Sequence, residues 1–348
     1  MDKTFLEVLK EHRDRYPGME PQDYGKLVYQ SEFGPGHMVR DLPSARMMLK
    51  QELLSLPGDA APKQPEAVGG GLCRFPLSEC GSPESVDLLA DLFALTAQKH
   101  SGTIDGLLAK LDQVIALEIP GIGEWSESWR KEGFPSVHHS EAFRTLYHPH
   151  YRLLKKEYAG YFSALLAIHV LKEKKAPVLI GIDGRCGSGK TRLAALIGEL
   201  FPCNCVLMDD FYLPVPKRSG NWKEIPGGNI DFMRLQEEIF ASAAAGEEIV
   251  YRPYSCQKGG ITEIRRMKPQ RLTIIEGSYS HHPLLSGQYD LKIFLTCSKE
   301  EQMRRLKLRE KEYFPVFKEQ WMPLEEQYFN CFSTEESSDI RIDTSKLF

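Results

Sequence analysis

The stretch that decides the fold of this chain is Gly-Arg-Cys-Gly-Ser-Gly-Lys-Thr, residues 184–191. It fits the pattern G-x-x-x-x-G-K-[ST] at every fixed position. Glycines at these positions let the backbone curve tightly, so that successive N–H groups can point at one phosphate group. Lys190 can reach the β- and γ-phosphates of a nucleotide, and the Thr191 hydroxyl can hold Mg²⁺. The pattern predicts a binding site for ATP with Mg²⁺.

The residues on either side of the loop supply the context that the motif needs. Residues 178–182 form a short apolar run, typical of a buried strand, and apolar residues between 193 and 200 recur on one helical face. A chance match in a glycine-rich turn would lack this order of strand, loop and helix. The positive end of the helix would also face the phosphate. We expect these residues to bind the nucleotide: Gly184, Arg185, Cys186, Gly187, Ser188, Gly189, Lys190, Thr191 and Arg192.

Further short apolar runs follow the loop, at residues 206–208, 272–275 and 291–295, with helical segments between them. Short apolar strands alternating with helices are typical of a parallel sheet that helices cover on both faces. The sequence therefore predicts an α/β fold, with a P-loop domain of mainly parallel sheet over residues 175–348.

The first half of the chain, residues 1–174, has a different pattern. Apolar residues recur at helical spacing in residues 85–98, 107–115 and 151–171. Residues 57–71 are rich in Pro, Gly and Ala, which predicts a mobile loop. We therefore expect a mostly α-helical N-terminal domain, whose role the composition does not indicate.

The bulk composition excludes several classes of protein. A length of 348 residues suggests two domains, and a net charge of −4 argues against a general nucleic-acid binder. Apolar runs are too short for a membrane span, and the N-terminus lacks the apolar core of a signal peptide. The eight cysteines contain no C-x-x-C pair, which favours reduced thiols. We expect a cytoplasmic protein, and whether it forms a homo-oligomer stays open.

Carboxylates follow several of the predicted strands. Asp209 and Asp210 come directly after residues 205–208, Glu276 follows residues 272–275, and Asp183 ends the first strand. One such acid could simply cap a helix. Two acids on separate strands beside a phosphate site favour chemistry, because ligands bind at the carboxyl ends of parallel strands. We predict Asp209 as the base for an acceptor hydroxyl and Glu276 as a ligand of Mg²⁺ or of its water.

Residues 300–311 have the spacing of a basic helix, with Arg305 and Arg309 on one face. Such runs are usually solvated surface helices. Here the segment follows the fourth predicted strand, where arginines could neutralise the oxygens of a phosphoryl group in transfer. We favour a catalytic lid that carries Arg305 and Arg309.

The second half of the chain resembles the uridine kinase and phosphoribulokinase family of P-loop kinases. The resemblance covers nearly all of residues 177–343. Five segments carry it, in the family's order: GIDGRCGSGKT (181–191), MDDFYLP (208–214), NWKEIPGGNIDFMRL (221–235), IIEGSYS (274–280) and RRLKLRE (304–310).

The resemblance implies roles for individual residues. Asp209 would be the acceptor-side base and lie close to Mg²⁺, and Glu276 would lie near the metal. Arg305 and Arg309 would be lid arginines. The residues implied near the acceptor pocket are Tyr212, Tyr254 and Asp231.

The departures from the family concern the nucleoside. Uridine kinases have an Asp shortly after the Asn-aromatic pair, where this chain has Lys223 and Glu224. They also carry a His a few residues beyond the tyrosine that matches Tyr254, and residues 255–260 contain none. A lost polar contact costs much selectivity. We therefore predict transfer of the γ-phosphoryl group of ATP to a hydroxyl of a small metabolite, with uridine as one candidate.

Two stretches of the first half stand out, residues 29–37 with Asp41, and residues 137–152. They hold five of the ten histidines and, with Glu32, could form a metal or acid–base site. A pocket for the acceptor or an effector, or a structural or dimer-forming role, are the alternatives. For the whole chain, two rival functions stay open: a regulatory NTPase without a metabolite acceptor, and a bifunctional enzyme with a catalytic N-terminal domain.

Overall fold

The computed structural model describes residues 3–348 except 40, 55, 57–63, 256–257 and 262. The chain divides into two compact units, one of residues 1–162 with 347–348 and one of residues 163–346. It passes from one unit to the other within a single helix, α8 (Lys156–Lys174). Whether residues 1–174 and 175–348 act as separate functional domains stays a prediction.

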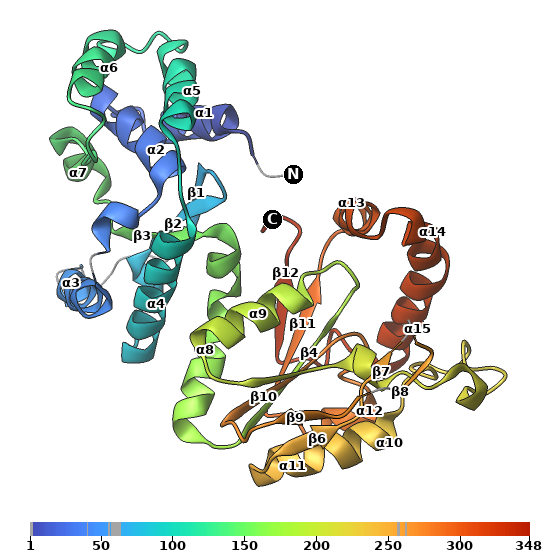
Figure 1. Ribbon diagram of the computed structural model, residues 1–348. Coiled ribbons are helices and arrows are strands. Elements are labelled where there is room, and N and C mark those ends of the chain that lie inside the picture. The colour runs from blue at the N-terminus through green and yellow to red at the C-terminus, as the bar shows by residue number, and fades with distance from the viewer. Residues whose placement is uncertain (1–2, 40, 55, 57–63, 256–257, 262) are drawn as a thin grey trace. The chain divides into compact units, whose positions relative to one another are not determined.

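The first unit is mostly helical, with one small antiparallel sheet (Figure 1). The sheet has the order β1–β2–β3, and each strand runs antiparallel to its neighbour. Its elements are α1 (Phe5–Arg15), α2 (Pro21–Phe33), η1 (Gly36–Met38), α3 (Leu42–Leu54), β1 (Glu66–Gly69), β2 (Leu72–Pro76), η2 (Leu77–Glu79), α4 (Pro83–Lys99), α5 (Ile104–Ile115), α6 (Ile122–Lys131), α7 (Glu141–Tyr147) and β3 (Tyr151–Lys155).

Two expectations for this unit need correction. The predicted loop at residues 57–71 contains β1, while residues 57–63 lie outside the described residues. The predicted helix at residues 151–171 begins only at Lys156, because the five residues before it pair with β2. Leu153 and Leu154 are both buried, so these apolar residues, which suggested one face of a helix, belong to a strand that is buried on both sides.

The predicted helices at residues 85–98 and 107–115 are confirmed as α4 and α5. Local chemistry explains where the helices of this unit begin. Short polar side chains accept a hydrogen bond from the backbone N–H three residues later, which satisfies a donor that the helix leaves open. The residues that do so are Thr4 for α1, Ser82 for α4, Thr103 for α5 and Ser140 for α7.

The second unit is built on a five-stranded sheet in the order β12–β11–β4–β10–β5, with every neighbouring pair parallel. The strands are β4 (Val178–Gly184), β5 (Asn204–Leu207), β10 (Leu272–Glu276), β11 (Leu291–Thr296) and β12 (Ile340–Asp343). The predicted α/β class with a parallel sheet is therefore confirmed. The edge strand β12 was not predicted, because only two of its four residues are apolar.

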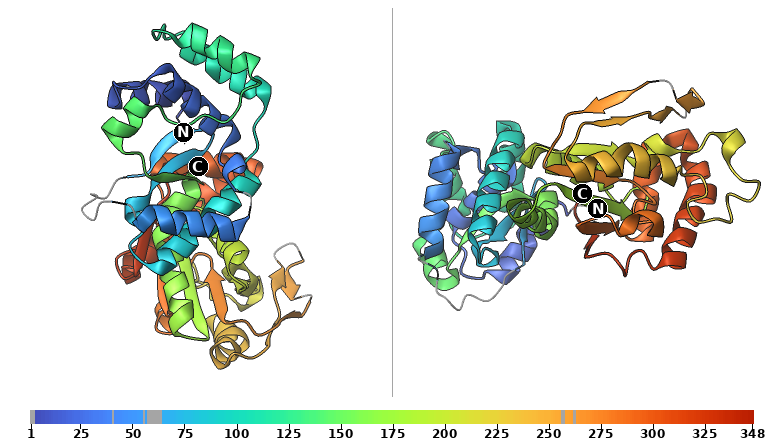
Figure 2. Two further views of the ribbon diagram at one scale, coloured as in Figure 1. Left: turned by 90° about the vertical axis from the view of Figure 1, so that its left-hand side faces the viewer. Right: turned by 90° about the horizontal axis from the view of Figure 1, so that it is seen from below.

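Helices flank this sheet, and two small hairpins lie beside it (Figures 1 and 2). The helices are α9 (Lys190–Leu200), η3 (Met208–Phe211), η4 (Val215–Lys217), α10 (Phe232–Leu235), η5 (Gln236–Phe240), α11 (Ala241–Ala245), α12 (Pro283–Ser286), α13 (Lys299–Glu310), η6 (Lys311–Tyr313), α14 (Phe314–Val316), η7 (Phe317–Trp321) and α15 (Met322–Phe332). The hairpins pair β6 (Ile249–Tyr251) with β9 (Arg265–Met267), and β7 (Tyr254–Ser255) with β8 (Gly260–Ile261).

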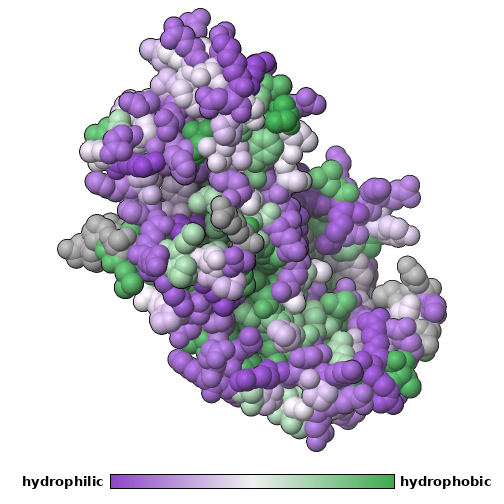
Figure 3. Space-filling view, turned by 60° about the vertical axis from the view of Figure 1, so that its left-hand side comes forward, coloured by the Kyte–Doolittle hydropathy of each residue, from purple (hydrophilic) through white to green (hydrophobic). Residues whose placement is uncertain are grey.

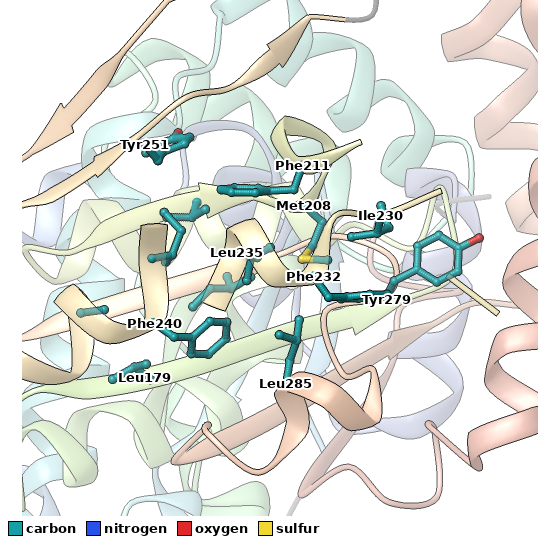
Figure 4. Close-up of a cluster of buried hydrophobic side chains, with 14 of the residues drawn as sticks. Leu179, Met208, Phe211, Ile230, Phe232, Leu235, Phe240, Tyr251, Tyr279 and Leu285 are labelled. Atoms are coloured by element: carbon teal, nitrogen blue, oxygen red, sulfur yellow. The ribbon is translucent and has the colours of Figure 1, made fainter. Parts of the chain in front are cut away.

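The core of the second unit fixes the strand ends that carry the site. Helix α9 packs on β4, β5 and β10. A cluster of buried hydrophobic side chains contains Leu179 of β4 together with Leu235 and Phe240. It also includes Met208 and Phe211, which follow β5 (Figure 4). Since Met208 and Phe211 are wholly buried, the chain between them is held at the carboxyl edge of the sheet.

The surface is largely hydrophilic on the face that Figure 3 shows, with hydrophobic side chains scattered over it. Within the described part of the chain, no helix has both the length and the apolar character that crossing a membrane requires.

Candidate active site

The loop between β4 and α9 has the backbone that a phosphate site needs. Gly184, Gly187 and Gly189 have φ of 137°, 77° and 99°. A Cβ atom at Gly184 would lie 2.0 Å from the carbonyl oxygen of Leu295, so no other residue fits there. Gly189 is also the N-cap of α9, which brings the positive end of that helix to the loop. These features fit the phosphates of a nucleotide.

Lys190 lies over this loop. Its Nζ donates to the carbonyl oxygen of Gly184 at 2.6 Å and to that of Arg185 at 3.2 Å. It also lies 3.4 Å from Oγ of Ser278, which follows β10. The predicted phosphate-binding lysine is thus at the centre of the site and within reach of two strand ends.

Two of the predicted metal ligands are in contact. The Thr191 hydroxyl donates to Oε1 of Glu276 at 2.9 Å. Glu276 is buried at the end of β10, and burial raises the pKa of its carboxyl while Lys190 acts in the opposite direction. A hydroxyl and a carboxylate are oxygen ligands of the kind that Mg²⁺ prefers, so these residues fit a magnesium ion.

Asp209 lies at the same edge of the sheet. Leu207 of β5 pairs in register with Glu276 of β10, and Asp209 follows two residues later in η3. Its charge contributes to the raised pKa of Glu276, and its Oδ1 accepts a hydrogen bond from the Tyr212 hydroxyl at 3.0 Å. Asp209 is exposed, so an acceptor can reach it.

The neighbouring carboxylate, Asp210, has another environment. It is buried and accepts hydrogen bonds from the Tyr251 hydroxyl at 2.9 Å and from Arg265 at 2.8 Å. Burial raises its pKa. Of the adjacent pair, Asp210 ties η3 to the β6–β9 hairpin, and Asp209 faces solvent.

Asp183 is wholly buried and serves the loop. Its carboxylate accepts from the backbone N–H of Gly184 at 2.7 Å, from that of His281 at 2.9 Å and from the Tyr328 hydroxyl at 2.8 Å. Three donors satisfy this buried charge, which lowers the cost of burying it. Asp183 therefore positions the turn out of β4.

The two predicted lid arginines have different surroundings. Arg305 donates to the carbonyl oxygen of Gly187 at 3.1 Å, to Thr344 at 2.9 and 2.6 Å, and to Glu301 at 2.7 Å. It therefore braces the phosphate loop. Arg309 is exposed, and its guanidinium lies 5.7 Å from the centre of the Phe317 ring.

Arg309 nonetheless acts on the loop through its charge. Burial raises the pKa of the Cys186 thiol well above its usual range, and Arg309 acts in the opposite direction. Of the two predicted lid arginines, Arg305 contacts the loop directly, and Arg309 acts on it through its charge.

Other loop residues predicted to bind the nucleotide contact the protein. The guanidinium of Arg185 donates to Glu326 at 2.7 Å, to Glu335 at 2.7 Å and to Thr296 at 2.8 Å. Ser188 is buried, and its carbonyl oxygen accepts from Thr344 at 2.7 Å. Arg192 is exposed on the first turn of α9.

The sequence did not point to Glu325, which lies inside the site. Its Oε2 accepts from the backbone N–H of Cys186 at 2.9 Å, and its Oε1 accepts from the Ser278 hydroxyl at 2.6 Å. Burial raises the pKa of this carboxyl, and Lys190 lowers it. No motif contains Glu325. The one available signal is its helical spacing with the buried Tyr328 of α15.

Of the three residues that the family resemblance implies near the acceptor pocket, two lie beside Asp209 or its segment η3. Tyr212 contacts Asp209, and Tyr254 is buried in β7, which packs on η3. Asp231 caps α10, accepting from the Arg234 N–H at 3.2 Å. Aromatic rings add to this side of the site: Tyr212 and Trp222 each lie 6.4 Å from Trp321, centre to centre.

The acidic residues of the first histidine stretch have partners other than histidine. Glu32 binds Lys110 at 2.8 Å, and Asp41 binds Ser44 at 2.8 Å. Among the residues that the structure describes, no three His, Cys, Asp or Glu side chains are grouped so as to hold a metal ion. Four histidines do line one cavity: His138, His139, His148 and His150.

Comparison with known proteins finds kinases. Uridine-cytidine kinase C of Dictyostelium discoideum is 26% identical over 146 residues, which cover 39% of this chain and 31% of that protein. The match thus spans about a third of the length of this relative. No family model matches the sequence.

Among solved structures, a protein described as a possible uridine kinase from Bacillus stearothermophilus is 19% identical, with a TM-score of 0.42 over 53% of this chain and 97% of that one. D-glycerate 3-kinase from Cryptococcus neoformans is 16% identical, with a TM-score of 0.32 over 44% and 79%. Likenesses this distant bear on neither substrate nor reaction. The curated relative and the loop between β4 and α9 show that the chain contains a P-loop kinase region similar to the uridine kinase and phosphoribulokinase family.

Proposed function

We propose that this chain, whose P-loop region is similar to the uridine kinase and phosphoribulokinase family, transfers the γ-phosphoryl group of ATP to a hydroxyl of a small metabolite. The observation that carries the proposal is the convergence of three strand ends: Lys190 on the loop after β4, Glu276 ending β10, and Asp209 following β5. Phosphoryl transfer depends on positioning and on charge stabilisation, and these groups supply both.

The roles follow from the contacts. The loop glycines and Lys190 hold the triphosphate, and Thr191 with Glu276 holds the metal. When bound there, Mg²⁺ supplies positive charge to the phosphate oxygens. Arg305 keeps the loop in shape through the carbonyl of Gly187. The exposed Arg309 is the arginine able to close over the phosphates.

Asp209 accepts the proton of the acceptor hydroxyl or orients that hydroxyl. The Tyr212 hydroxyl donates to one of its carboxylate oxygens, which fixes the orientation of the group. General-base residues of this kind contribute about 10² to 10⁴ in rate. Tyr212 is therefore a positioning residue for Asp209.

For the acceptor, the aromatic rings of Tyr212, Trp222 and Trp321 favour a molecule with a flat ring, because such a ring can stack on them. A nucleoside has that shape. Lys223 and Glu224 stand where uridine kinases place a ribose-binding Asp, so uridine is one candidate among nucleosides and related alcohols.

The test is ATP consumption by the full chain across nucleosides, pantothenate and sugar alcohols, with mass spectrometry of the product. We expect one acceptor to gain a phosphoryl group, and Asp209→Asn to slow that transfer at least about 100-fold. Asp14→Asn, at an exposed carboxylate of α1, is the matched control and should keep full activity. ATP consumption that no acceptor changes would favour the regulatory NTPase instead.

A further inference from the structure

The first unit contains a cavity of about 470 Å³ that the kinase reaction does not use. It lies between α2, α3, α7 with the residues that flank it, and the start of β3. Most small-molecule sites have volumes of about 300–1,000 Å³. The histidine-rich stretch of residues 137–152 lines this cavity, so this feature of the sequence, which had no role, has a location.

The charges that line the cavity are mostly positive. Among the residues that the structure describes, Lys26, Arg144 and Arg152 line it, against a single carboxylate, Glu52. Glu52 already pairs with Arg152 at 2.7 Å and with His150 at 3.1 Å. With neutral histidines, three cations and one carboxylate leave two positive charges, those of Lys26 and Arg144.

Keeping Lys26 positively charged in this cavity costs free energy. Its Nζ donates to the carbonyl oxygen of Val137 at 2.9 Å, and no carboxylate pairs with it among the described residues. Burial, together with the charges of Arg74 and Arg144, lowers the pKa of Lys26 to about 8. A bound anion would offset this cost.

One wall of the cavity is a fixed hydrogen-bonded chain. His139 Nδ1 lies 2.9 Å from Asp23, and His139 Nε2 lies 2.7 Å from the Tyr151 hydroxyl. Burial lowers the pKa of His139 to about 4, so the ring is neutral. Its Nδ1–H donates to Asp23, and its Nε2 accepts from Tyr151.

The chain continues behind Tyr151. The Gln30 amide donates to the Tyr151 oxygen at 2.9 Å, and Arg74 donates to the Gln30 carbonyl at 2.9 and 3.1 Å. Each member is therefore held by the next. The charges at the two ends, Asp23 and Arg74, have opposite sign, so they leave the positive balance of the cavity unchanged.

We propose that this cavity binds a small phosphate monoester. A monoester carries nearly two negative charges at neutral pH, which matches the two unneutralised cations. Arginine and lysine donate strong charge-assisted hydrogen bonds to phosphate oxygens. The volume admits a phosphate with a small organic group attached. The site is separate from the phosphate loop, because every residue that lines it belongs to the first unit.

The experiment is isothermal titration calorimetry of the full chain with glycerol 3-phosphate and with inorganic phosphate. The chain is first saturated with Mg²⁺ and a non-hydrolysable ATP analogue, so that the phosphate loop is filled. Glycerol is the uncharged comparison. We expect binding of both phosphates and none of glycerol.

Arg144→Gln is the informative variant, because Arg144 is exposed on α7 and the substitution removes its charge without emptying a buried position. It should weaken binding of glycerol 3-phosphate at least about tenfold, the usual effect of one lost charge-assisted bond. Arg130→Gln removes an equally exposed charge of α6 outside the cavity and should leave binding unchanged.

Lys26→Met tests the half-buried cation and should weaken binding further. Three results would overturn the proposal: no binding to the unaltered chain when the phosphate loop is filled, equal binding by Arg144→Gln and the unaltered chain, or equal loss in Arg144→Gln and Arg130→Gln. Because the phosphate loop is occupied throughout, the outcome does not depend on the kinase reaction.

Discussion

At the scale of single residues, Gly184 shows how strictly the loop is specified. Its φ of 137° lies in a region that side chains rarely adopt, and a Cβ would meet the Leu295 carbonyl. We expect Gly184→Ala to reduce ATP affinity at least about tenfold, because the loop must shift to relieve the contact. Titration with ATP measures it. Gly287→Ala, with no atom within 4 Å of its added carbon, is the control. Equal affinities in both variants would contradict the expectation.

Glu325 makes stability depend on pH. Burial raises the pKa of its carboxyl, so between the ordinary value of 4.5 and that raised value the folded chain binds more protons than the unfolded chain. The contribution of Glu325 to the free energy of unfolding therefore falls as pH rises through this window, by about 1.4 kcal/mol for each unit by which the pKa is raised.

Glu325→Gln removes this titration. The free energy of unfolding of the unaltered chain, less that of the variant, should decrease as the pH rises above 4.5 in urea titrations. Glu312→Gln, at an exposed carboxylate in η6, is the matched control. A difference that rises with pH for Glu325→Gln would show that the carboxylate is stabilised in the fold, against this reasoning.

At the scale of elements, α15 holds the loop through successive side chains. Glu325 binds Cys186, Glu326 binds Arg185, and Tyr328 binds Asp183. We expect Tyr328→Phe to destabilise the chain by about 1–3 kcal/mol, because Asp183 stays buried with one donor fewer while the ring still fills its space. Unfolding in urea measures this loss. Tyr313→Phe, at a 72% exposed tyrosine, should be neutral, and a neutral Tyr328→Phe would mean that another donor replaces it.

The elements also show what the sequence could predict. Buried central strands such as β4 and β10 are short apolar runs, and the loop between β4 and α9 has a motif, so both were predicted. The strand β3 has two adjacent leucines that fit a helix equally well, and only pairing with β2 decides its form. The edge strand β12 has no such apolar run.

At the scale of the whole molecule, the two units differ in how much of their sites a local sequence pattern reveals. In the second unit, the residues proposed to bind phosphate and metal lie within motifs, so the sequence pointed to Lys190, Thr191, Glu276 and Asp209. The residues that support them, such as Glu325, reach the site by tertiary packing, which spacing in one sequence does not encode. In the first unit no motif exists, and the cavity forms only when residues 26 and 137–152 fold together.

The ties on the phosphate loop have a thermodynamic consequence. Glu325, Arg305 and Thr344 all bind backbone groups of residues 186–188. A loop ordered by its own protein does not have to lose conformational entropy when a ligand arrives. Little of the free energy gained from contacts with a nucleotide would therefore be lost in ordering the loop. In this sense the site is preorganised for binding.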